Sequence, residues 1–172
     1  MNTLLEEAIE AWEDARNGVI AEVENIPPNR FDFRPAPKAR NVTELVLHIM
    51  EVSLMMVGEL RREDTDFHRA AFPRLVALYS KPVAGLTGKR QLLAALRSTL
   101  REGVEAFRET GEIHMLQLII RFDGERGTRL AWLHHGISQE MYHRGQLALY
   151  QRLMGITPSQ TFSSLGTGID AP

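Results

Sequence analysis

The sequence contains no cysteine among its 172 residues. This absence excludes disulfide bonds, thiolate metal ligands and a cysteine nucleophile, so any thiol chemistry would need a thiol brought in by a ligand. An excess of positive charge is also missing, since 20 Lys and Arg residues stand against 22 Asp and Glu residues and the formal net charge is −2. No dense run of Lys and Arg with interleaved aromatic residues is present. We therefore do not expect nucleic acid as a partner.

The sequence also lacks a long uninterrupted apolar run. Its most apolar span, residues 42–60, contains Glu44, His48, Glu51 and Glu59, whose transfer into a bilayer would be costly. The first residues have neither the basic region nor the apolar region of a secretory signal. These features predict a soluble, cytoplasmic protein with no membrane partner.

The strongest signal that is present is helical periodicity. Hydrophobic residues make up 44% of the chain and charged residues 24%, an ordinary globular composition that predicts a single domain over residues 1–172. Apolar residues recur at three- and four-residue spacing in four long segments, which predict helices over residues 3–23, 42–62, 88–110 and 129–155. Asn41, Thr87 and Thr128 are the expected N-caps of the last three helices. The core is expected to end at about residue 155, with residues 156–172 as a loop and tail.

The segments between these helices carry breaker residues. Residues 26–40 contain four prolines, which predict an extended loop. Residues 61–87 are irregular, with a short helix expected over residues 72–79. Residues 112–128 contain a β-branched apolar run and an Asp123-Gly124 turn signal, which favour a strand-like segment or hairpin. Four long helices with such longer crossings between them are typical of an all-α, antiparallel four-helix bundle with long crossover connections.

Polar residues interrupt the inward faces of two of these helices. His48 shares a row with apolar residues on the second helix, so it is expected to point into the bundle. On the last helix, His135, Gln139 and His143 form a second row at one-turn spacing. Imidazoles from facing helices are the usual way in which a bundle builds a metal site in its core. The alternative is that each histidine is a hydrogen-bonded core residue.

Three segments resemble the signature regions of the DinB/YfiT family of metal-binding four-helix bundles: FRPAP, NVTELVLHIMEVSLMM and LAWLHHGISQEMYHRGQLALYQRLMG. Order, spacing and the final His-Arg-Gly-Gln match, and the resemblance extends from the first helix to Gly155. It implies a site of three histidines, in which His48 matches the first and His143 the third. It also implies a divalent metal (zinc, nickel, manganese or iron) and a homodimer. The activity that it implies is that of a transferase using low-molecular-weight thiols, or of a hydrolase. In either case the small-molecule substrate would enter the interhelical cleft.

The sequence departs from the family pattern at the middle ligand, where Gln139 replaces a histidine. A neutral amide is a weak ligand for zinc or nickel and binds mainly through its oxygen. His135 is an alternative donor, although about 12 Å of helix axis separates it from His143. A carboxylate could replace the missing ligand instead, the candidates being Glu44, Glu51 and Glu140.

Two functions follow from this departure. The first is a metal-dependent thiol transferase or hydrolase in which Gln139 is a tolerated ligand. The second is a non-catalytic bundle that has lost its metal and binds a small molecule or a protein partner. A third chemistry is suggested by Glu140-x-x-His143, the unit used by di-iron bundles, but that site needs further inward glutamates on the other helices.

Overall fold

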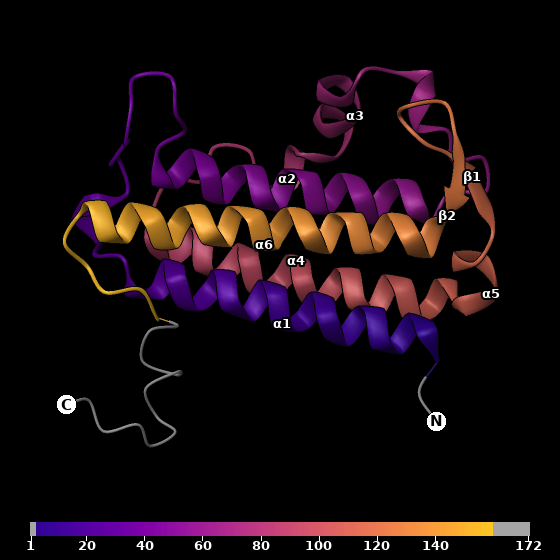
Figure 1. Ribbon diagram of the computed structural model, residues 1–172, viewed down its shortest axis with the longest axis horizontal. Coiled ribbons are helices and arrows are strands. Elements are labelled where there is room, and N and C mark those ends of the chain that lie inside the picture. The colour runs from indigo at the N-terminus through magenta and orange to yellow at the C-terminus, as the bar shows by residue number, and fades with distance from the viewer. Residues whose placement is uncertain (1–2, 160–172) are drawn as a thin grey trace, which may run out of the picture.

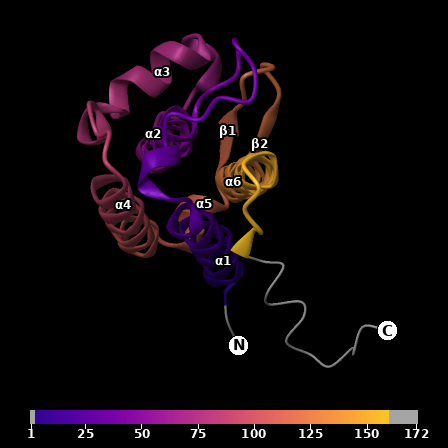
Figure 2. The same cartoon turned by 90° about the vertical axis from the view of Figure 1, so that its left-hand side faces the viewer.

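Four long helices lie side by side along the length of the molecule (Figure 1). The computed structural model describes residues 3–159. The four helices are α1 (Leu4–Asn25), α2 (Val42–Leu60), α4 (Lys89–Thr110) and α6 (Arg129–Leu153). Helices α1 and α6 run in one direction and α2 and α4 in the other, and the end view in Figure 2 shows the four surrounding a common core. The predicted four-helix bundle is confirmed.

The connections contain the short elements of the fold. A 3₁₀ turn, Pro28–Arg30, follows α1, and a second turn, Phe67–Arg69, follows α2. The crossover from α2 to α4 then forms α3 (Phe72–Tyr79) and a third turn, Lys81–Val83, which confirms the expected short helix. Between α4 and α6 lie α5 (Glu112–Met115) and an antiparallel hairpin of β1 (Leu118–Ile120) and β2 (Arg126–Thr128). Gly124 forms the predicted hairpin turn with a φ of 82°, a conformation that favours glycine.

Side-chain caps set the starts of three of the long helices. Thr3 caps α1, Asn41 forms a complete capping box with Glu44 on α2, and Thr128 caps α6. Thr87 was the wrong choice for α4, because that helix is capped by Gly88, whose backbone N–H reaches the side chain of Gln91.

The end of the last helix also differs slightly from the prediction. Helix α6 ends at Leu153, and Gly155, two residues later, has a φ of 75°, the left-handed conformation common after the end of a helix. Of the predicted loop and tail, residues 156–158 continue in irregular backbone and residues 160–172 lie outside the described residues. No helix within residues 3–159 combines the length and apolarity needed to cross a bilayer.

Candidate metal centre

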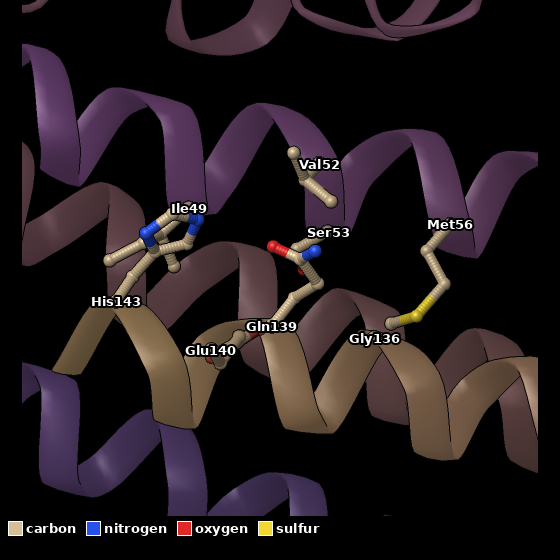
Figure 3. Close-up of a pocket in the computed structure, with 8 residues that line it drawn as sticks. All are labelled: Ile49, Val52, Ser53, Met56, Gly136, Gln139, Glu140 and His143. Carbon is tan, nitrogen blue, oxygen red and sulfur yellow. The ribbon is translucent and has the colours of Figure 1, made fainter. Parts of the chain in front are cut away.

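His48 of α2 and His143 of α6 face each other across the bundle. Their ring centroids are 5.0 Å apart and their planes are nearly perpendicular. Gln139, one turn before His143, projects from α6 toward α2 in the same direction as His143 (Figure 3). These two α6 side chains, with Ser53 of α2, border a cavity of about 10 Å³, which is close to the space that one water-sized atom needs.

The two ring nitrogens of His143 have different surroundings. Nδ1 lies 2.8 Å from the side-chain oxygen of Gln146, and in the tautomer that suits this contact Nδ1–H donates a hydrogen bond to that oxygen. Nε2 is then the unprotonated nitrogen, and it is buried without a hydrogen-bond partner. A fixed tautomer with a free inward lone pair is the arrangement that metal-binding histidines adopt when a neighbouring acceptor orients the ring.

Burial keeps both imidazoles neutral at neutral pH. It lowers the pKa of His48 from 6.5 to about 4, with smaller contributions from the positive charge of Arg40 and from the charge that His143 carries when it is protonated. Burial also lowers the pKa of His143, against a partly opposing effect of its hydrogen bond to Gln146. A histidine must be deprotonated to bind a metal, so neither ring needs to lose a proton first.

The carboxylate nearest to this cavity is engaged elsewhere. Glu140 is 3% exposed and turns toward α1. It accepts hydrogen bonds from Arg16 Nε at 2.8 Å, Arg16 Nη2 at 2.6 Å and the indole nitrogen of Trp12 at 2.7 Å. Arg16 is fully buried and also donates to Thr99 and to the Leu96 carbonyl oxygen on α4. Glu140 is therefore a structural partner of Arg16, which removes the central residue of the di-iron pattern.

The remaining substitutes for a ligand lie away from the cavity. Glu44 pairs with Arg34 at the start of α2. His135 is exposed and stacks on Trp132, with ring centroids 4.6 Å apart. Residues 3–159 contain no group of three or more His, Cys, Asp or Glu side chains that could hold a metal ion. The donors that the fold brings together are two imidazoles and one amide, a set that suits a divalent ion held more weakly than by three histidines.

The residues that flank His143 differ in their roles. Gln146 orients the ring, whereas Arg144 turns to α1 and covers Gly18, where a Cβ atom would meet the guanidinium at 2.1 Å. Tyr142 is 64% exposed and places its ring edge-on to that of His143 at 5.2 Å. Arg144 therefore belongs to the packing of α6 on α1, and Gln146 to the site.

Two larger clefts include residues of the candidate centre or their hydrogen-bond partners. The first, which we call the aromatic cleft, has a volume of about 370 Å³ and shares Gln139 with the cavity; its lining residues are Val52, Met55, Phe72, Phe122, Trp132, His135, Gly136 and Gln139. The second, the basic cleft, has a volume of about 450 Å³ and includes Gln146, the partner of His143; it is lined by Arg34, Lys38, Ala39, Arg40, Glu44, Leu45, Gln146 and Tyr150. The candidate centre thus lies between an apolar and a positively charged cleft.

Comparison with known proteins agrees with this architecture. The model of the DinB family matches residues 1–165. The chain belongs to the DinB family. No curated protein matches it.

Several solved structures share the fold, and DinB-like proteins are among them. A DinB-like protein from Bacillus subtilis, YjoA, has a TM-score of 0.66 and 20% identity, over 88% of this chain and 93% of that one. YfiT from Bacillus subtilis, described as a probable metal-dependent hydrolase with an unusual four-helix bundle topology, has a TM-score of 0.65 and 16% identity, over 89% of each chain. A mycothiol-dependent maleylpyruvate isomerase has a TM-score of 0.65 and 16% identity, over 86% of this chain and 63% of that one. At these identities the likeness establishes the fold.

Sequence reasoning missed the partner of Glu140. Arg16 lies four residues after Trp12, on the stripe of α1 that packs into the core, and both side chains are fully buried. A buried arginine requires a carboxylate or several carbonyl oxygens. The place of Arg16 on this stripe therefore predicts a buried acceptor on another helix, but it does not identify the residue that supplies the acceptor.

Proposed function

We propose that this DinB-family protein binds one divalent metal ion between α2 and α6 and uses it in a thiol-transfer or hydrolytic reaction. His48 and His143 would hold the ion through ring nitrogens, and Gln139 would add a weaker amide oxygen. The observation that carries the proposal is the buried, unpartnered Nε2 of His143 beside the ring of His48. Leaving a buried acceptor without a partner costs about 1–3 kcal/mol, which a metal ligand role would offset.

A metal in such an open site lowers the pKa of a thiol or of water and so supplies a nucleophile at neutral pH. The chain's own contribution is to orient His143 through Gln146 and to keep both imidazoles unprotonated. The basic cleft supports thiol transfer over hydrolysis, because Arg34, Lys38 and Arg40 would attract a thiol that carries carboxylates. Gln146 borders this cleft, so a thiol bound there would lie next to the residue that orients His143.

The test is metal content, measured by mass spectrometry of untagged protein after incubation with zinc, nickel, manganese and iron and removal of the excess. We expect the natural protein to retain about one ion per chain and His143→Ala to retain none. His134→Ala is the matched control, because His134 is an exposed histidine of the same helix. Gln139→His should bind the ion more tightly than the natural chain, since it restores a third nitrogen ligand.

The second candidate function is a metal-free bundle that acts through binding. It is favoured by the absence, within residues 3–159, of a cluster of three strong metal-binding side chains. If only Gln139→His retains metal, this candidate replaces the first.

A homodimer is part of the proposal under either function. Met141, Leu149 and Leu153 are exposed apolar residues at four- and eight-residue spacing on one face of α6, and such a face suits a helix-to-helix contact. Sedimentation equilibrium of the natural protein and of Leu149→Glu would decide it, because a charge on this face should shift a dimer to monomer.

A further inference from the structure

The aromatic cleft has the dimensions and lining of a small-molecule site. Its volume of about 370 Å³ lies in the range of typical ligand pockets. Its walls come from four separate parts of the fold: Val52 and Met55 from α2, Phe72 from α3, Phe122 from the hairpin, and Trp132 from α6. The 61–88 crossover and the hairpin therefore both contribute to a pocket that the four long helices alone would not form.

The aromatic side chains that line the cleft pack against one another and against a buried phenylalanine. Phe67 is fully buried, and its ring centroid lies 4.9 Å from that of Phe122 and 5.2 Å from that of Trp132. Phe72 meets Phe122 edge-on at 5.7 Å. His135 stacks on Trp132 with an interplanar angle of 20°. The cleft therefore offers preformed flat surfaces, and little side-chain ordering is needed to bind a flat ligand.

The polar groups of the cleft are few, and one of them also borders the candidate metal centre. His135 and Gln139, four residues apart on α6, are the polar side chains among its lining residues, and no Asp, Glu, Lys or Arg is among them. Gln139 also borders the small cavity in front of His143. A ligand in the cleft would thus meet apolar rings on its sides and an amide at the end nearest to His143.

We propose that the aromatic cleft binds the planar, uncharged part of the substrate, such as an aromatic ring, with the reacting atom at the Gln139 end. This assignment rests on the proposed function for its orientation. An ionised group would lose its hydration among these rings without gaining a counter-charge, so the cleft selects neutral ring systems over anionic ones. The basic cleft on the other side of the centre would receive the charged partner.

The test uses the two tryptophans as internal probes. The chain has only Trp12 and Trp132, so ¹⁵N-labelled protein gives two indole N–H signals. Trp132 lines the cleft, whereas Trp12 is buried and donates its indole N–H to Glu140. Titration of the metal-free protein with 2-naphthamide should shift the Trp132 signal and the Gln139 side-chain amide signals in a saturable way and leave Trp12 unmoved. The anionic analogue 2-naphthoate should bind at least about tenfold more weakly.

Two variants of α3 provide a matched pair. Phe72 is 39% exposed and lines the cleft, and Leu78 is 62% exposed on the same helix and does not. Phe72→Ala should weaken 2-naphthamide binding by roughly fivefold, because it removes one ring contact, and Leu78→Ala should leave the dissociation constant unchanged. An unmoved Trp132 signal, equal affinities of the two variants, or tighter binding of 2-naphthoate would each overturn the proposal.

The outcome is independent of metal binding. The titration is made on the metal-free protein, so the affinity for 2-naphthamide is measured without the ion. Binding of 2-naphthamide without metal retention would leave the cleft assigned and remove the proposed chemistry. Metal retention without 2-naphthamide binding would leave the proposed chemistry in place and remove the assignment of the cleft.

Discussion

Removal of the Glu140 carboxylate should be among the most destabilising single changes in this protein. In Glu140→Ala, the guanidinium of Arg16 stays fully buried and loses both of its charge-assisted hydrogen bonds to the carboxylate. Breaking a buried ion pair by removing one partner costs about 3–5 kcal/mol, since the remaining charge is uncompensated. For a chain of this length, that loss lowers the melting temperature by about 6–20 °C.

A double variant separates this penalty from the net value of the pair. Arg16→Met combined with Glu140→Leu removes both charges, and similar apolar replacements of buried ion pairs are often neutral or stabilising. The double variant still leaves the Trp12 indole N–H without its acceptor, a cost of about 1–3 kcal/mol. We therefore expect the double variant to be more stable than Glu140→Ala alone, although less stable than the natural protein.

The assay is guanidinium unfolding followed by far-UV circular dichroism, with free energies of unfolding compared at equal slope. A stability of Glu140→Ala within about 1 kcal/mol of the natural protein would refute this prediction, because an uncompensated buried guanidinium should destabilise the fold by more than that. The prediction also fails if the double variant is less stable than Glu140→Ala. Either result would mean that Arg16 finds water or another acceptor when Glu140 is removed.

Three further predictions follow from the same structure. Gln146→Leu removes the acceptor of His143 Nδ1, and it should weaken metal binding by about 10–100-fold in a competition titration with a chelator, with unchanged affinity contradicting the orienting role. Gly103→Ala would place a Cβ atom 2.4 Å from the buried Trp12 ring and should lower the free energy of unfolding by about 1–3 kcal/mol in denaturant unfolding. Gly145 also lies within a long helix, but a Cβ atom added there would meet no other atom within 4 Å. Gly145→Ala should therefore stabilise the protein by about 0.5–1 kcal/mol. Burial and a 2.7 Å hydrogen bond to Glu59 raise the pKa of Tyr79 above its usual 10.0. The free energy of unfolding by which the natural protein exceeds Tyr79→Phe should therefore be full below pH 10.0 and decline as the pH rises past that value. Urea unfolding in which this difference grows with pH would refute the prediction.

The helices and their inward residues could be predicted because both depend on local spacing. A 3.6-residue period of apolar side chains identified all four long helices, and it placed His48 and His143 on the inward faces that the structure brings together. Asn41 and Thr128 were recognisable as caps because their side chains act within three residues. The choice between Thr87 and Gly88 was less well determined, since both are acceptable N-caps.

The polar core and the aromatic cleft depend on distant parts of the chain. The hydrogen bonds from Arg16 to Glu140 join residues 124 positions apart, a pairing that no local pattern indicates. Phe72 and Phe122 lie in the two least regular segments, where periodicity gives no face. Their meeting with Trp132 is set by the path of the crossover and the hairpin over the bundle, and only tertiary structure reveals it.

The distance along the chain between Arg16 and Glu140 has a consequence for biosynthesis. Arg16 emerges from the ribosome with the first helix, and its counter-charge is added 124 residues later, roughly 6–25 s afterwards at ordinary elongation rates. Until then, burying the α1 stripe would bury an unpaired guanidinium, which is strongly unfavourable. Burial of the α1 stripe is therefore disfavoured until the last helix, which carries Glu140, has been made.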